Sequence, residues 1–342
     1  MSITPTMTDV AREAGVGVAT VDRVINKRAA VKPATLQRVL EAAERIGFRR
    51  TNLIRRRAEE PAQGCRMGII LQKRSTQFYA DLGEAIVTTA TAHEYRNDNV
   101  RVVFLEELVP RQIIEQMHRL AQECDVLAIV AADHPLISQA IDQLSQQGIP
   151  VIALISDLTA EHCAGYVGLD YRKVGRMAAW TLTKLGPDSS KIGLMIGSHR
   201  YQNQEQNEMS FRAYLREFAP EVQVLETVIS LEDIPLAKAS TVEMLEMHPD
   251  LGAIYIAGGG IEGVCEALRE YQLPQQLIVI CMELTAATRV ALADGTIDVV
   301  LSHPLELAAG RLLKAMKEAT RHQGQGSLQH TLPFFTYTAA NI

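Results

Sequence analysis

The sequence of 342 residues is longer than a single compact core usually requires, so two or three domains are expected. Its hydrophobic content of 47% and charged content of 22% are typical of a globular protein and exclude extensive disorder. The net charge of −6 conceals an asymmetry, because residues 1–60 contain 12 Lys and Arg against seven Asp and Glu, and the remainder contains 22 against 33. This balance predicts that only the amino-terminal segment binds a polyanion, although a solvated basic face would give the same charge.

The five cysteines are scattered and never occur in CxxC spacing, which disfavours a disulfide framework or a zinc site and favours a reducing compartment. The first residues do not combine a positive region with an apolar core, so a signal peptide is not expected. Apolar runs stay well below the ~18 residues of a membrane span. We therefore expect a cytoplasmic protein with no membrane partner, no metal and no cofactor.

The first elements are three short helices. Thr6 and Asp9 form a capping pair for a helix over residues 7–14. A turn with two glycines follows, and helical spacing resumes over residues 18–25, with a third helix from Pro33 to just before Gly47. Two short helices joined by a glycine-containing turn and braced by a third predict an all-α helix-turn-helix domain over residues 1–48. A generic three-helix bundle is the alternative.

The pattern T-x-x-D-V-A-x-x-A-G-V-x-x-x-T-V-x-R-V-x-N runs from Thr6 to Asn26. It resembles the amino-terminal domain of the lactose-repressor (LacI/GalR) family of transcriptional regulators. That resemblance implies that Val18, Ala19 and Arg23 read bases from the recognition helix. Arg23 would be the strongest reader, since a guanidinium contacts guanine O6 and N7 together. The remaining polar residues are interpreted as phosphate-positioning residues or caps: Thr6, Thr20, Asn26 and Thr35.

Two positions depart from the family pattern. Gly17 stands where Ser or Thr usually caps the recognition helix, a change worth only a few tenths of a kcal/mol. Asp22 replaces a small hydroxyl residue on the side expected to face DNA. A carboxylate there is repelled by phosphates unless it accepts a proton from a cytosine amine or orients Arg23, and we favour the orienting role.

Residues 49–64 form an arginine-rich linker. In the family this segment folds on DNA into a hinge helix that inserts a leucine into the minor groove. Here Arg57 replaces that leucine and Arg50 replaces the usual proline, which leaves Leu53 or Ile54 as a shifted wedge. The arginines are expected to contact phosphates and the minor groove, with a flexible basic tether as the alternative: Arg49, Arg50, Arg55, Arg56 and Arg57.

From residue 65 onward, short apolar runs alternate with helical stretches, which predicts parallel sheets covered on both faces. A break near residues 159–165 indicates two lobes with a cleft between them. The expected strands are 67–71, 102–105, 126–130, 150–155, 166–169, 192–196, 222–228, 253–257, 277–282 and 298–302.

By its layout this body resembles the two-lobed α/β core of periplasmic sugar-binding proteins found in the same family. The resemblance implies that the last segments cross back between the lobes. The effector-binding and dimerisation domain would thus be residues 65–342, with a first lobe of about 65–165 and 301–325. The second lobe would be about 166–300 and 326–342. The closing TYTAANI resembles the family's terminal strand, with its Asn at position 341.

Ligands of such folds bind beyond the carboxyl ends of the strands, where several candidate residues lie. Phe78 and Tyr79 could stack on a sugar ring, or belong to the core. Asp133, Asp170 and Glu283 could accept hydroxyl protons, or act as helix caps. The other candidates are His303, which could also simply begin a helix, and four residues of the segment 199–211 that alignment does not separate: Arg200, Glu205, Asn207 and Glu208. The glycines at 258–260 offer bare backbone amides in a turn.

Carboxylates, amides and aromatic rings with few fixed cations suit a neutral sugar or polyol. A phosphorylated ligand stays open because Lys73, Arg74 and Arg200 lie nearby in sequence. The leading hypothesis is therefore a homodimeric repressor that binds a near-palindromic double-stranded DNA operator under the control of a small-molecule effector.

Two other classes of protein were considered. A sugar-processing enzyme is disfavoured because the sequence lacks GxxxxGK[ST], HExxH and GxSxG, and the basic head would have no purpose. A transport-type sugar-binding protein would share the body but would need export.

Overall fold

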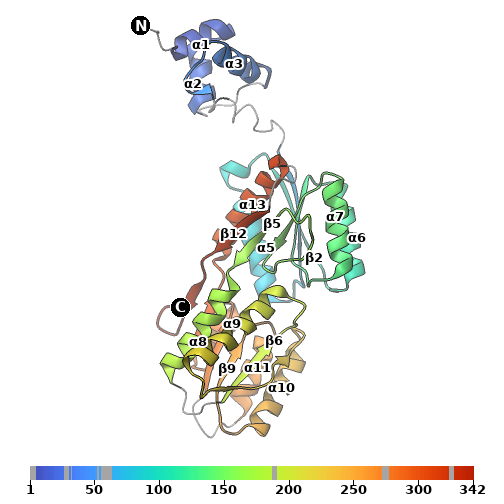
Figure 1. Cartoon of the computed structure of the whole chain (residues 1–342), viewed down its shortest axis with the longest axis vertical. Coiled ribbons are helices and arrows are strands. Elements are labelled where there is room, and N and C mark those ends of the chain that lie inside the picture. Colours follow the sequence, from blue (N-terminus) through green and yellow to red (C-terminus); the bar gives the residue numbers. More distant parts are fainter. Residues whose placement is uncertain are drawn as a thin grey trace. The chain divides into compact units, whose positions relative to one another are not determined.

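The computed structural model describes residues 5–26, 31, 33–51, 54, 64–186, 191–271, 277–322 and 327–342. Two compact units, Met1–Gly64 and Cys65–Ile342, each form their own core, and each is described by itself (Figure 1).

The first unit contains α1 (Met7–Ala14), α2 (Val18–Asn26) and α3 (Pro33–Arg45). The Thr6 side chain accepts from the backbone N–H of Asp9, whose carboxylate accepts from that of Thr6, so the expected capping box is present. Gly15 ends α1 in the left-handed region with φ 61°. Nη2 of Arg38 on α3 donates to the carbonyls of Ala14 and Gly15 at 2.6 and 3.1 Å, which fastens this turn to the third helix.

The core of this unit contains Val10, Val21, Val24, Ile25 and Val39, and it extends beyond the three helices to the fully buried Ile54. One sequence-based expectation is thereby corrected. The Ile54 side chain is committed to the core of the head in this conformation, so it is not a free wedge for the minor groove.

The second unit has two lobes. Lobe 1 contains a parallel sheet with strand order β12-β5-β4-β3-β1-β2. Helices α6 and α7 cover one face and α5 and α13 the other (Figure 1). Its elements are β1 (Arg66–Leu71), α5 (Gln77–Ala90), η1 (His93–Tyr95), β2 (Asn99–Phe104), α6 (Pro110–Ala121), β3 (Val126–Ile129), α7 (Pro135–Gln146), β4 (Val151–Leu154), β5 (Gly165–Leu169), α13 (Leu305–His322) and β12 (Leu328–Leu332).

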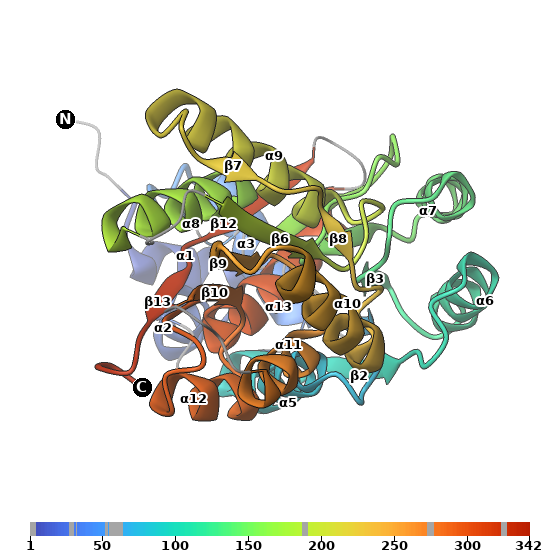
Figure 2. The ribbon, with the colours of Figure 1, turned by 90° about the horizontal axis from the view of Figure 1, so that it is seen from below.

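Lobe 2 has the strand order β13-β11-β10-β9-β6-β7, with β8 also paired to β6, and β13 is antiparallel to β11. Figure 2 shows α8 and α9 on one side of this sheet and α10, α11 and α12 on the other. Its elements are α8 (Tyr171–Leu185), β6 (Lys191–Ile196), α9 (Gln202–Phe218), β7 (Gln223–Val224), β8 (Val228–Ile229), α10 (Ile234–Met247), β9 (Leu251–Ile256), α11 (Ile261–Glu270), β10 (Ile278–Met282), α12 (Ala286–Ala293), β11 (Val299–Ser302) and β13 (Phe335–Tyr337). Buried strands such as β9 and β10 read as continuous apolar runs because helices cover both faces.

Strand pairing corrects the expected lobe boundaries. β5 pairs with β4, so the break at residues 159–165 is a loop within lobe 1, and the chain first crosses between Leu169 and Tyr171. β11 remains in lobe 2, α13 packs on lobe 1, and β12 pairs with β5 of lobe 1. The last crossing therefore follows Leu332 instead of residue 325. The physical reason is that an edge position beside β5 is open to a late strand, which local patterning does not reveal.

Two smaller expectations also change. The single strand expected over 222–228 is split into β7 and β8, and β12 was not anticipated. In the closing segment only the part up to Tyr337 is strand, and Asn341 closes the terminal turn by accepting from the Thr338 backbone N–H at 2.7 Å. Within the described parts of the chain, no helix is both long enough and apolar enough to cross a bilayer.

Candidate functional site

The recognition helix α2 separates its residues by face. Val21, Val24 and Ile25 are buried in the small core, whereas Ala19, Arg23 and Val18, which is 43% exposed, face solvent. This division follows from the helical repeat, since residues three or four apart share a face. The three side chains expected to read bases are therefore accessible.

The other expected DNA-contacting residues have local partners. Asn26 donates to the Asp22 carboxylate at 2.6 Å, one turn along the helix, so the contact seen for Asp22 is with Asn26 and the orienting role toward Arg23 stays a prediction. Thr6 serves as the cap of α1. Thr20 is half-buried. Arg55, Arg56, Arg57 and Leu53 lie outside the described residues.

A cavity lies between the two lobes of the second unit and contains about 650 Å³ of space, part of it open to solvent. Most of its wall comes from loops that follow β4, β8, β9 and β10 and from the amino ends of α5, α8 and α9. These are the positions at which ligands bind in doubly wound folds. The lining residues are Thr76, Phe78, Tyr79, Ile155, Tyr171, Asn203, Gln204, Glu232, Ala257, Gly258, Gly259, Gly260, Ile261, Glu262, Met282, Glu283 and Thr285.

Three of the residues expected to bind ligand line this cavity. Phe78 and Tyr79 lie at the start of α5 with their rings edge to face at 5.1 Å. Glu283 follows β10 and adopts φ 66°, a strained conformation for a residue other than glycine. The glycines at 258–260 also line the cavity.

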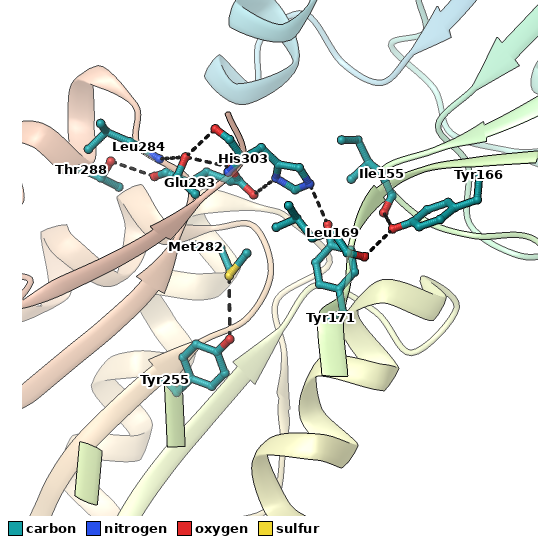
Figure 3. Close-up of polar contacts among 11 residues, drawn as sticks. Ile155, Tyr166, Leu169, Tyr171, Tyr255, Met282, Glu283, Leu284, Thr288 and His303 are labelled. Carbon is teal, nitrogen blue, oxygen red and sulfur yellow. Dashed lines mark hydrogen bonds and ion pairs between the residues drawn. The ribbon is translucent and has the colours of Figure 1, made fainter. Parts of the chain in front are cut away.

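His303 does not line the cavity, but it connects two residues that do. Its buried ring is 2.7 Å from Oε1 of Glu283 through Nδ1, and 3.1 Å from the Tyr171 hydroxyl through Nε2 (Figure 3). Burial raises the pKa of Tyr171 well above its ordinary value, so the phenol keeps its proton. A Tyr171 hydroxyl that donates to Nε2 and an Nδ1–H that donates to Glu283 satisfy both contacts at once.

Asp133 and Arg200 lie outside the cavity and join the lobes. The Asp133 backbone N–H donates to the Arg200 carbonyl at 2.7 Å, and Gln202 Nε2 donates to the Asp133 carboxylate at 3.2 Å. We call Asp133, Arg200 and Gln202 the lobe bridge. Asp133 also accepts from the Thr159 backbone N–H and hydroxyl at 3.2 and 3.0 Å, so in this conformation its carboxylate is used within the protein and not for a ligand.

The remaining expected residues have structural positions. Asp170 caps α8 by accepting from the Lys173 backbone N–H at 3.3 Å, which agrees with the capping alternative. Glu205 is exposed. Asn207 is fully buried and accepts from the Tyr255 hydroxyl at 2.9 Å. Glu208 binds Arg212 at 2.9 Å in a separate surface hollow. None of these four side chains lines the cavity, because α9 presents to it only the residues of its first turn.

The residues that sequence reasoning missed are Asn203, Gln204, Glu232, Glu262 and Tyr171. Glu232 directly follows β8, and a search at the end of that strand would have found it had the strand not been extended over 222–228 as one element. Gln204 lies one position from Glu205, and the rotation of α9 decides which of them faces inward. Its Oε1 accepts from the backbone of Gly197 and Ser198 at 2.7 and 2.9 Å, and its Nε2 donates to Glu232 at 2.8 Å.

The electrostatic character of the cavity is acidic. Among the described lining residues are Glu232, Glu262 and Glu283, but no Lys, Arg or His. Burial raises the pKa of the Glu232 carboxyl, and the hydrogen bond from Gln204 and the charge of Lys73 offset only part of that rise. A ligand with strong hydrogen-bond donors would therefore be favoured at this wall.

Two family models match the chain. The one described as bacterial regulatory proteins, lacI family, matches residues 6–51, and the one described as periplasmic binding protein domain matches residues 67–323. The chain belongs to the lacI family of bacterial regulatory proteins. The resemblance noted for residues 6–26 and for the body is thus confirmed.

Curated relatives of this lacI-family protein carry regulator names. It is 28% identical over 181 residues to Catabolite control protein A of Priestia megaterium, which covers 53% of this chain and 52% of the relative. It is 26% identical over 278 residues to the HTH-type transcriptional regulator GalS of Salmonella typhimurium, which covers 80% of this chain and 79% of the relative. The chain thus spans about half the length of the first of these relatives.

Solved structures confirm the two-lobed fold. A solute-binding protein of an ABC transporter from Burkholderia graminis, in complex with D-arabinose, gives a TM-score of 0.74 at 19% identity, over 82% of this chain and 98% of that one. GanP, a glucose-galactose binding protein from Geobacillus stearothermophilus, gives a TM-score of 0.74 at 14% identity, over 82% and 99%.

Proposed function

We propose that this protein is a cytoplasmic homodimeric repressor that binds a near-palindromic DNA operator through α2 and releases or grips it according to whether a sugar or polyol occupies the cavity. The observation that carries this proposal is the combination, in one lacI-family chain, of an accessible recognition face with an interlobe cavity. A ligand acts if it binds one arrangement of the lobes more tightly than another.

The chemistry of the cavity supports a polyhydroxylated effector. The Phe78 ring offers an apolar surface for a sugar ring, while carboxylates and amides accept and donate hydrogen bonds to hydroxyl groups. Lys73, Arg74 and Arg200, which had left a phosphorylated ligand open, are absent from the described lining residues. Solved structures of the same fold carry D-arabinose or the name of a glucose-galactose binding protein, which agrees with this class.

The first prediction tests the DNA-binding half of this proposal. Replacement Arg23→Ala should cost about 1–3 kcal/mol in operator affinity and relax discrimination at one base pair, because a bidentate guanine contact is lost. Footprinting and competition with single-base operator variants measure both effects.

Arg12→Ala is the matched control, because it removes the same charge from an exposed position on α1. The control should weaken binding to all DNA sequences about equally and should lower the salt dependence. Unchanged discrimination in Arg23→Ala would contradict the role of Arg23.

A further inference from the structure

The free polar atoms of the cavity are predominantly hydrogen-bond acceptors. The Gln204 amide is used entirely by the protein, with its oxygen on two backbone N–H groups and its nitrogen on Glu232. Oδ1 of Asn203 is buried and has no hydrogen-bond partner. Tyr171 is hydrogen-bonded to His303. A ligand must therefore bring donors to this wall, since an acceptor facing another acceptor would leave both unsatisfied.

Two carboxylates of the cavity lack a cationic partner. Within the described parts of the chain, neither Glu232 nor Glu262 forms an ion pair, whereas Glu283 lies 2.7 Å from the His303 ring. Glu232 and Glu262 come from consecutive loops of lobe 2, after β8 and at the start of α11. A Cβ on Gly259 would approach the Glu232 side chain to 3.0 Å, so the glycine loop packs directly against this carboxylate.

The backbone holds Glu232 in this arrangement. Leu231 and Glu232 have φ of 52° and 56°, and the Ser230 hydroxyl accepts from the Glu232 backbone N–H while donating to the Gly259 carbonyl at 2.8 Å. Consecutive left-handed residues other than glycine are costly, and such strain persists only where surrounding contacts enforce it. The carboxylate is thus directed by the fold and is not a mobile surface group.

We propose that the effector carries a protonated amine, as in an amino sugar or an amino polyol, and that this ammonium group binds to Glu232 and Glu262. The proposal rests on the proposed function and specifies its ligand. The hydroxyl groups of the same molecule would use Glu283 and Asn203, and its apolar face would lie on Phe78. An ammonium group offers three donors and one positive charge, which matches a wall of carboxylate and amide oxygens.

Two features oppose this assignment, and neither outweighs it. The uncapped amino end of α11 favours an anion, but Glu262 in its first turn already supplies a negative charge there. Lys73 acts on Glu232 from lobe 1, yet the pKa of this carboxyl is raised on balance, so the burial cost is incompletely compensated. A metal ion is disfavoured, because the described residues contain no group of three or more His, Cys, Asp or Glu that could hold one.

The test measures binding to the full-length protein by calorimetry and thermal shift. The panel consists of hexosamines, amino pentitols and aminocyclitols, each paired with the parent in which a hydroxyl replaces the amine, together with N-acetylated, phosphorylated and uronic acid forms. We expect at least one amine to bind roughly ten- to a hundredfold more tightly than its hydroxyl parent, as a charge-assisted hydrogen bond permits. Its affinity should fall as the pH rises through the pKa of its own amine.

Variants then locate the ammonium group. Glu232→Gln and Glu262→Gln should each abolish the preference for the amine while retaining weak binding of the hydroxyl parent. Glu205→Gln is the control, because this exposed glutamate of α9 lies outside the cavity. It should bind the amine as the wild type does.

The outcomes separate this proposal from the proposed function. Equal or tighter binding of hydroxyl, N-acetylated or anionic forms overturns the ammonium proposal, as does a panel in which no amine binds. Operator footprinting on the same preparations tests the regulator independently. If footprinting fails while the amines bind, the proposed function falls and the ligand assignment stands.

Discussion

Glu205 and Glu232 are glutamates of the same lobe with opposite surroundings. Glu205 is exposed on α9, whereas Glu232 is partly buried, accepts a hydrogen bond from Gln204 and adopts φ 56°. Desolvation penalises the ionised form of a buried carboxyl, so the two residues should differ in their contribution to stability at neutral pH. The residue type alone does not distinguish them.

We predict that Glu232→Gln stabilises the ligand-free protein at neutral and alkaline pH. The amide keeps the hydrogen bond from Gln204, and it does not titrate. Because burial raises the pKa of Glu232 above its ordinary value of 4.5, the wild type loses stability relative to the variant as the pH rises through that raised pKa. Melting temperatures should therefore converge near pH 4 and diverge by about pH 8, whereas Glu205→Gln should show no such divergence.

Gly17 offers a second prediction at the residue scale. Its carbonyl accepts from the Thr20 backbone N–H at 2.8 Å, and a Cβ added there would meet no atom within 4 Å. Gly17→Ser should therefore supply the missing cap of α2 and stabilise the helix by a few tenths of a kcal/mol, which is about a twofold gain in hydrogen-exchange protection. Gly15→Ser should instead destabilise the head by about 1 kcal/mol, because Gly15 has φ 61°. Equal effects of the two changes would contradict this assignment.

At the scale of elements, His303 connects three of them. It lies between β11 and α13, contacts Glu283 after β10, and contacts Tyr171 at the start of α8 (Figure 3). Two of these segments are places where the chain passes from one lobe to the other. A displacement of Glu283 by a ligand would therefore be transmitted to the connections between the lobes.

His303→Ala should lower the free energy of unfolding by about 1–3 kcal/mol, because it leaves buried polar partners unsatisfied. It should also weaken effector binding, since Glu283 loses its 2.7 Å contact. His303→Gln, which keeps a donor, should restore part of both. The comparison requires chemical unfolding and calorimetry on all three proteins, and equal loss in both variants would argue against a role through hydrogen bonding.

At the scale of the whole second unit, the lobes are joined by chain crossings and by polar contacts across the cleft. Besides the lobe bridge, Gln72 after β1 donates to the Tyr201 hydroxyl at 3.0 Å. These contacts stabilise the arrangement in which the cavity is enclosed. Effector affinity depends on the population of that arrangement, so each contact contributes to binding without touching the ligand.

Asp133→Ala should shift the lobes toward an open arrangement. The lost contacts with Gln202 and Thr159 are worth about 0.5–1.5 kcal/mol each, which predicts a several-fold to tenfold weaker effector affinity. Small-angle scattering of the ligand-free protein should report a larger radius of gyration, and Glu205→Ala is the control. Unchanged affinity and scattering would show that the lobe bridge does not hold the lobes together.

Much of the fold followed from local patterns. The capping box of α1, the turn at Gly15 and nearly every strand of the body were predicted, because each depends on residues a few positions apart. The cavity was predicted only in part. Phe78, Tyr79 and Glu283 were placed correctly at strand or helix ends, whereas Asp133 and Glu205 have the same local context and face elsewhere.

The sequence by itself determined the helix-turn-helix head, its family and the alternation of strands and helices, since periodicity, caps and turn residues act over one or two turns of chain. Only the tertiary structure decided that β5 and β12 belong to lobe 1 and that Asp133 joins the lobes. It also decided that Glu232, Glu262 and Glu283 share one cavity. These outcomes depend on which edge of a sheet is free and how each helix is rotated, and long-range packing sets both.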